Sequence, residues 1–236
     1  MSHDFVIDKI NIDSYLKELG KTFRKLNGTK TPAEIIIVGG ASILINYGFR
    51  DMTTDIDAII QASSAMKEAI SIVQEELNLP QAWINTDFKQ TSSYSSKLVQ
   101  YSKYYKTFSN ILEVRTISGE YLIAMKLMSA RNYKNDLSDI VGILIEHEKM
   151  VKSLTFEEIK KAIINLYGDY DKIPDGSKHF IEDVFKDNNY RNYYLSLRDS
   201  ESENFNSLID FEIKYPDVLT SDNLNEILKS IRSKQK

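Results

Sequence analysis

The pattern of apolar and polar positions predicts alternating strands and helices over the first two-thirds of the chain. Short apolar runs that are typical of strands occupy residues 35–38, 54–60 and 111–115. Helical spacing of apolar residues recurs over residues 13–26, 41–46, 63–77, 118–130 and 136–146. This order predicts an α/β (α+β) fold, in which a small mixed β-sheet is flanked by helices.

The last third of the chain shows only helical patterns. They cover residues 155–168, 179–185, 204–213 and 222–231. We therefore expect two regions, a core over residues 1–150 and a helical C-terminal region over residues 151–236 that packs on the core.

The stretch from residue 34 to residue 60 carries the candidate chemistry. Its first strand ends at Gly39 and Gly40, which open a short apolar helix. Asp55 and Asp57 stand two residues apart near the start of the next strand, so their side chains project from one face. Two close carboxylates repel, and a hard cation such as Mg²⁺ or Mn²⁺ removes that conflict. The backbone N–H groups at Gly39 and Gly40 would bind phosphate.

This pattern resembles the DNA-polymerase-β-type nucleotidyltransferase superfamily, with an apolar strand, Gly-Gly, a short helix and then Asp-x-Asp. In this chain 14 residues separate Gly40 from Asp55. The local sequence is also similar to bacterial nucleotidyltransferase-like proteins of the AbiEii toxin and DUF6036 kind. The resemblance implies Mg²⁺-dependent transfer of a nucleotidyl group from an NTP to tRNA, a protein side chain or a small molecule. It also implies a toxin-like or defence-associated role, with a cognate antitoxin as a partner.

A second stretch, EYLIAMKLMSAR followed at residues 134–140 by KNDLSDI, resembles the same bacterial family. By that match Lys126 and Asp136 belong to the site, and Arg131 is a further phosphate-binding candidate. Lys126 stands in an apolar helix, where an ammonium needs an anionic partner unless it reaches the surface. If it offsets triphosphate charge, Lys126→Met should spare folding and reduce transfer. The alternative for Asp136 is plain helix capping.

Glu113, in the strand over residues 111–115, is the first candidate for a third catalytic carboxylate and metal ligand. The resemblance implies such a residue on a neighbouring strand. The alternative interpretation is a solvent-facing glutamate beside Arg115. Asp136 is the other candidate for this role.

Two more residues are predicted to contact the nucleotide. Ser42, in the first turn of the short helix, can add a hydroxyl to the phosphate site, and Arg50 can add a charge. Arg50 and Lys126 can also neutralise Asp55 and Asp57 without a metal. That possibility supports the alternative function, a non-catalytic nucleotide- or partner-binding protein of the antitoxin-like kind.

Residues 97–106, KLVQYSKYYK, interleave basic and aromatic side chains. Such a pattern is typical of single-stranded nucleic-acid binding, and equally of an edge strand protected by lysine.

Composition narrows the remaining classes. The chain has no Cys and three scattered His, so thiol chemistry, disulfides and a zinc site are not expected. No apolar run approaches the roughly 20 residues of a membrane span, and no signal peptide is visible, so a cytoplasmic protein is expected. A net charge of −4 argues against a broad electrostatic grip on nucleic acid.

Overall fold

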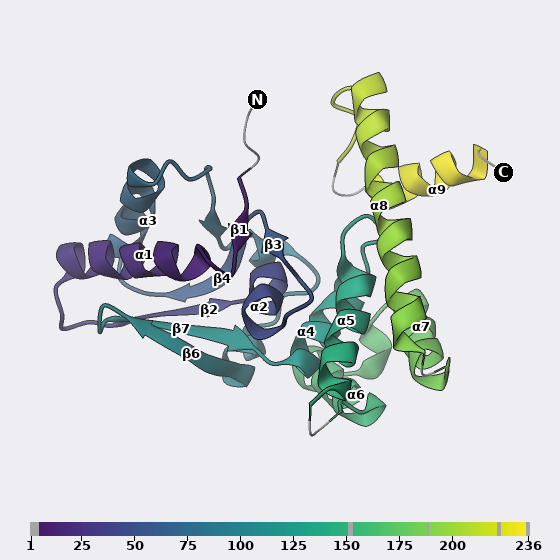
Figure 1. Ribbon diagram of the computed structural model, residues 1–236, viewed down its shortest axis with the longest axis horizontal. Coiled ribbons are helices and arrows are strands. Elements are labelled where there is room, and N and C mark those ends of the chain that lie inside the picture. Colours follow the sequence, from purple (N-terminus) through teal and green to yellow (C-terminus); the bar gives the residue numbers. More distant parts are fainter. Residues whose placement is uncertain (1–4, 151–152, 188, 221–222, 235–236) are drawn as a thin grey trace. The chain divides into compact units, whose positions relative to one another are not determined.

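The computed structural model describes residues 5–150, 153–187, 189–220 and 223–234 (Figure 1). Chain contacts divide the protein into two compact units. Unit 1 comprises Met1–Met125 and Glu157–Tyr170, and unit 2 comprises Lys126–Phe156 and Asp171–Lys236. Residues 126–150, which the sequence assigns to the first region, thus belong with the C-terminal helices.

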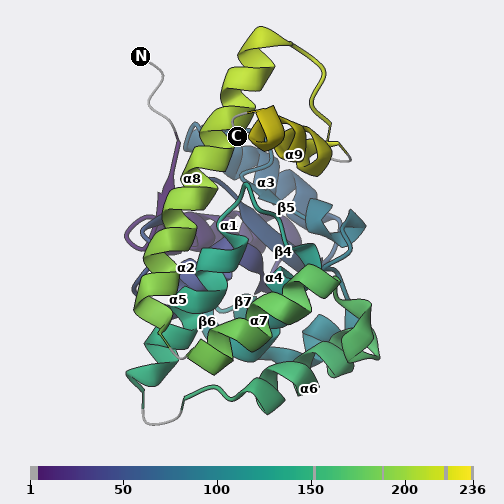
Figure 2. The ribbon, with the colours of Figure 1, turned by 90° about the vertical axis from the view of Figure 1, so that its right-hand side faces the viewer.

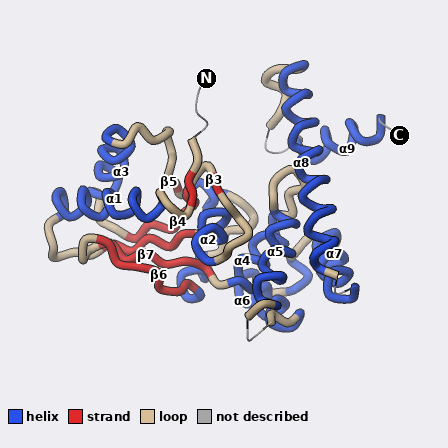
Figure 3. Tube along the Cα trace, in the orientation of Figure 1, coloured by secondary structure: helices blue, strands red, loops and turns tan. Residues whose placement is uncertain are grey.

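Unit 1 is built around a five-stranded mixed sheet with the order β5-β4-β2-β7-β6 (Figure 3). The strands are β2 (Ala33–Ile37), β4 (Ile56–Gln61), β5 (Ile84–Asn85), β6 (Ser102–Phe108) and β7 (Leu112–Ile117). Strand β2 pairs antiparallel with β4 and parallel with β7. A separate antiparallel pair joins β1 (Ile7–Asp8) to β3 (Met52–Thr53). The predicted α/β class and mixed sheet are confirmed.

One face of the sheet packs against α1 and α3, which lie side by side in Figure 1. The helices that lie wholly or mostly in unit 1 are α1 (Ile12–Asn27), α2 (Gly39–Asn46), α3 (Ala65–Glu76), α4 (Gly119–Ser129) and α6 (Phe156–Tyr167). Short 3₁₀ helices are η1 (Asp87–Gln90), η2 (Ser96–Tyr101) and η3 (Tyr170–Lys172).

The core of unit 1 follows from strand alternation. Every second residue of the central strands faces the helices, so an apolar residue at each such position is removed from water. These fully buried side chains are Ile35, Ile37, Ile56, Ala58, Leu112 and Val114. Burying each of the larger ones contributes about 1.5–3 kcal/mol. Asp57, at the alternate position of β4 between Ile56 and Ala58, is therefore left on the opposite face.

Strand β6 lies at the edge of the sheet and contains residues 102–106 of the basic and aromatic segment 97–106. Lys103 and Lys106 are exposed, and the amine of Lys106 forms an ion pair with Asp13 of α1. Exposed lysines discourage pairing of an edge strand with another chain. The edge-strand interpretation is confirmed for residues 102–106 and is wrong for residues 97–101, which form a 3₁₀ helix.

Unit 2 is helical. Its helices are α5 (Asp136–Glu148), α7 (Asp175–Asp187), α8 (Tyr190–Lys214) and α9 (Leu224–Lys234). Figure 2 shows α5 running along α8, with α9 against the C-terminal half of α8. The 25-residue α8 is far longer than the predicted segment 204–213. The prediction missed its first half because that half is polar and lacks a continuous apolar stripe. The predicted start of the last helix, Asp222, lies outside the described residues.

Within the described parts of the chain, no helix has both the length and the apolar character needed to cross a membrane.

Candidate functional site

Asp55 and Asp57 flank the first residue of β4. Ile56 and Ala58 are fully buried in the core, whereas both aspartates are partly exposed. Alternation along the strand therefore places the two carboxylates on the face of the sheet that lies away from α1 and α3. This arrangement agrees with the side-by-side projection that the sequence predicts.

The turn between β2 and α2 brings the backbone of Gly39 against Asp57. The N–H of Val38 donates to the carbonyl oxygen of Asp57 at 2.9 Å, which joins the end of β2 to β4. A methyl group at Gly39 would lie 3.4 Å from Oδ2 of Asp57. Gly39 has φ +58°, a left-handed conformation that costs other residues about 1–2 kcal/mol. Glycine thus allows the helix to begin beside the carboxylate.

Arg50 lies over Gly40 at the start of α2. A methyl group at Gly40 would be 2.8 Å from Nη2 of Arg50 and 3.1 Å from Oγ1 of Thr53, so it would displace the guanidinium. The Nε of Arg50 also donates to the carbonyl oxygen of Met52 at 3.1 Å. A cation is therefore held where the sequence predicts contact with a nucleotide.

Ser42 serves a different part of unit 1. Its side chain is fully buried, and Oγ accepts the N–H of Ile117 at 3.0 Å. The hydroxyl joins α2 to the end of β7, and this placement does not support the predicted contact with a phosphate.

Glu113 is not brought to Asp57. In the sheet register Glu113 stands opposite Glu34 at the start of β2, whereas Asp57 bonds to Val38 just after the end of β2. The carboxylate instead accepts a hydrogen bond from Nη1 of Arg115 at 2.7 Å. This geometry matches the alternative interpretation, a glutamate paired with Arg115.

The structure adds Asn85 to this end of the sheet. Asn85 is the register partner of Asp57 on β5, so the amide and the carboxylate lie on the same face. Its Oδ1 accepts the N–H of Asp87 at 2.9 Å, which fixes the amide. Sequence reasoning missed Asn85 because the surrounding residues 81–96 are polar and show no periodicity. Among the described residues, no group of three or more His, Asp or Glu side chains is arranged to hold a metal ion.

A second charged cluster lies in unit 2 and centres on Lys126. Its Nζ lies 2.8 Å from Oδ1 of Asp136 and 2.8 Å from Oδ2 of Asp139. Only 9% of the Lys126 side chain is exposed, so the interpretation that it reaches the surface is wrong. The two aspartates supply the anionic partner that a buried ammonium needs.

Asp136 is the most densely bonded group of this cluster. Its carboxylate accepts five hydrogen bonds, from Lys126, from Ser129 and three from Arg131. Burial raises the pKa of the Asp136 carboxyl, but the charges of Lys126 and Arg131 outweigh burial and hold the pKa well below its usual range. Asp136 is thus ionised at neutral pH. Arg131, the predicted phosphate-binding residue, forms an ion pair with Asp136.

Glu201 of α8 caps the N-terminus of α5. Its Oε1 accepts the backbone N–H groups of Leu137 at 2.9 Å and Ser138 at 3.3 Å. The cap therefore comes from another helix, and the capping alternative for Asp136 is wrong. Oε2 of Glu201 is buried and has no hydrogen-bond partner among the described residues. No sequence signal marks this role, since Glu201 stands in a polar Ser-Glu-Ser-Glu segment.

Glu201→Gln is expected to change how stability depends on pH. Burial, and then the Asp139 carboxylate, raise the pKa of Glu201 from 4.5 to about 7 against its hydrogen bonds. Between these values the folded state holds a proton that the unfolded state has released, so stability falls as pH rises. Glutamine mimics the protonated acid and does not titrate. The free energy of unfolding of Glu201→Gln, relative to that of wild type, should therefore rise by about 2 kcal/mol from pH 5 to pH 8. Urea unfolding at both pH values measures this gain.

The exposed Glu203 of the same helix provides the matched control, because Glu203→Gln should show the same difference from wild type at both pH values. A Glu201→Gln effect that does not change with pH would show that the buried carboxyl titrates normally.

A mixed sheet whose Gly-Gly turn lies against an Asp-x-Asp strand is the arrangement that the resemblance to nucleotidyltransferases implies. Comparison with family models agrees, since the model described as nucleotidyltransferase of unknown function (DUF6036) matches residues 14–194. The match spans well over half of the chain, and the protein belongs to this family. The family description names no substrate, acceptor or toxin role. No curated protein and no solved structure matches the chain.

Proposed function

We propose that the protein is a metal-dependent nucleotidyltransferase whose donor site lies at the Asp55 end of the sheet in unit 1. The observation that carries this proposal is the approach of the Asp57 carboxylate to Gly39, at the start of α2. A helix N-terminus offers N–H groups to phosphate oxygens. Carboxylates beside it attract the cation that accompanies a triphosphate.

Asp55 and Asp57 fit Mg²⁺ or Mn²⁺ as the metal. Mg²⁺ is usually held by one or two protein carboxylates together with substrate phosphates and water, so a third acidic ligand is not required. When bound, the ion would neutralise the phosphates and stabilise the charge that develops on the leaving pyrophosphate. Arg50, placed over Gly40, would add a second positive charge.

The proposed step is an in-line displacement at the α-phosphorus of an NTP. An acceptor oxygen forms the new P–O bond, the bond to the β-phosphate bridging oxygen breaks, and pyrophosphate leaves with that electron pair. The acceptor hydroxyl loses its proton to solvent water. Asp136 is poorly suited to accept that proton, because its low pKa and five hydrogen bonds make it a weak base.

Labelling experiments would identify the acceptor, which is tRNA, a protein side chain or a small molecule. The placement of Arg50 favours a second candidate function. A guanidinium held over Gly40 can serve as an internal counter-ion for the carboxylates, as a non-catalytic nucleotide- or partner-binding protein would require.

Binding of a non-hydrolysable NTP separates the two functions. Wild type should bind it about tenfold more tightly with Mg²⁺ than with EDTA, since one metal-mediated charge contact is worth roughly 1.4 kcal/mol or more. The pair Asp55→Asn with Asp57→Asn should abolish that difference. Tight binding that ignores Mg²⁺ and survives the double substitution would favour the non-catalytic function.

A further inference from the structure

A cavity of about 510 Å³ lies within unit 2, between α7, α9 and the connection from α4 to α5. Its volume falls in the range of roughly 300–1,000 Å³ that is typical of small-molecule sites. Among the described residues, its lining contains Lys and Arg but no Asp or Glu. The chain as a whole has a net charge of −4, whereas the charged side chains that line this cavity are positive.

Three polar side chains of α9 face this cavity. Asn225, Lys229 and Arg232 follow helical spacing and share one side of the helix. Nη2 of Arg232 donates to Oγ of Ser200 on α8 at 3.1 Å, which holds the guanidinium in place. Two cations that face one cavity repel each other when its lining contains no Asp or Glu, and an anionic ligand removes that repulsion.

The opposite wall suits a nucleobase. Phe180 of α7 supplies an aromatic ring, on which a base can stack. Asn132, on the connection from α4 to α5, and Asn225, on the α9 side of the cavity, each carry an amide that can donate to and accept from the edge of a base. Gly176, at the start of α7, leaves space, because a methyl group there would have no atom within 4 Å.

We propose that this cavity binds a nucleotide, with the phosphate on Lys229 and Arg232 and the base on Phe180. The nucleotide is either free or the terminal residue of an RNA strand, since both present the same phosphate and base. This site is separate from the donor site and does not require transfer at Asp55 and Asp57.

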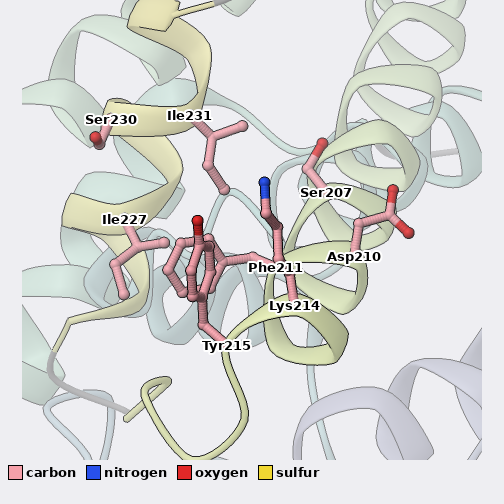
Figure 4. Close-up of a pocket in the computed structure, with 8 residues that line it drawn as sticks. All are labelled: Ser207, Asp210, Phe211, Lys214, Tyr215, Ile227, Ser230 and Ile231. Carbon is pink, nitrogen blue, oxygen red and sulfur yellow. The ribbon is translucent and has the colours of Figure 1, made fainter.

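A neighbouring cavity of about 440 Å³ provides an internal control (Figure 4). It lies between α8 and α9, where Ile227 and Ile231 face Phe211 and Tyr215. Its lining also includes Lys214, together with the carboxylate of Asp210. Lys214→Gln therefore removes one positive charge from a cavity of the same unit without altering the proposed site.

The experiment is calorimetric titration of the full chain with AMP, in EDTA and low salt. Wild type should bind AMP, and adenosine should bind at least about tenfold more weakly because it lacks the phosphate. Lys229→Gln with Arg232→Gln should also weaken AMP by about tenfold or more, since hydrogen bonds to charged groups are lost. Gly176→Leu should block the cavity. Lys214→Gln, and the pair Asp55→Asn with Asp57→Asn, should bind AMP as wild type does.

A 5′-phosphorylated RNA hexamer identifies the source of the nucleotide. Tighter binding of the hexamer than of AMP assigns the site to a strand end, and equal or weaker binding assigns it to a free nucleotide. The proposal is overturned if wild type does not bind AMP, if adenosine binds equally, or if the double charge variant retains wild-type affinity. Lys229 and Arg232 are exposed, so their replacement leaves folding intact and the test holds even if Gly176→Leu unfolds.

Discussion

Lys126→Met is expected to lower the free energy of unfolding by about 3–5 kcal/mol, because it removes the buried cation that Asp136 and Asp139 share and leaves Asp136 with Arg131 alone. Asp136 and Asp139 each lie 2.8 Å from the lysine amine, and at most 2% of either side chain is exposed. Neither carboxylate can recover its hydration while the helices stay packed. The sequence alone suggested that this change would spare folding, and the buried ion pairs replace that expectation. Urea unfolding measures the loss.

Lys149→Met is the matched control for this prediction. Lys149 forms an ion pair with Glu146 at 2.7 Å, but 65% of its side chain is exposed. An exposed pair contributes about 0–1 kcal/mol, so this change should scarcely alter unfolding. If both methionine variants lose the same small amount, the Lys126 cluster is not a structural ion-pair network, and a ligand-binding role for Lys126 gains support.

Asp57→Asn is expected to reduce nucleotidyl transfer by about 10³-fold, since it removes a charge that positions the metal and the triphosphate. Asparagine keeps the shape of the aspartate side chain. It should therefore fit beside Gly39, where a methyl group added to the glycine would lie 3.4 Å from Oδ2 of Asp57. The fold should therefore persist while the activity is lost. Incorporation of label from each NTP into the protein itself, tRNA or cell extract measures this effect.

Asp51→Asn controls for the loss of one negative charge from the same part of the chain. Asp51 is exposed and directly precedes β3. Its substitution should leave transfer unchanged. Equal activity of Asp57→Asn and wild type would remove Asp57 from the donor site.

Much of the fold was predictable because its elements carry clear apolar periods. The strands at β2, β4 and β7 and the helices α1, α3, α4 and α5 follow their predicted ranges within a few residues. The first half of α8 was not predictable, since this polar segment buries few side chains, among them Tyr190 and Glu201. Periodicity detects an apolar face, and this helix segment lacks one.

The candidate site was predictable only where local geometry dictates it. Alternation along β4 places Asp55 and Asp57 on one face, and the Gly39 turn follows from its glycine conformation. Glu113 was misplaced, because the register that sets it opposite Glu34 depends on pairing between distant strands. The same limit applies to Asn85, whose place beside Asp57 follows only from the pairing of β5 with β4.

Release of pyrophosphate by the purified protein tests the central claim most directly. The protein would be incubated with Mg²⁺, each labelled NTP in turn and cell extract as the source of acceptor. Pyrophosphate and incorporated label should then appear in equal amounts, and both should disappear in EDTA. Absence of both products with all four NTPs, from folded protein that still binds an NTP, would contradict the assignment of the Asp55–Asp57 end of the sheet to nucleotidyl transfer.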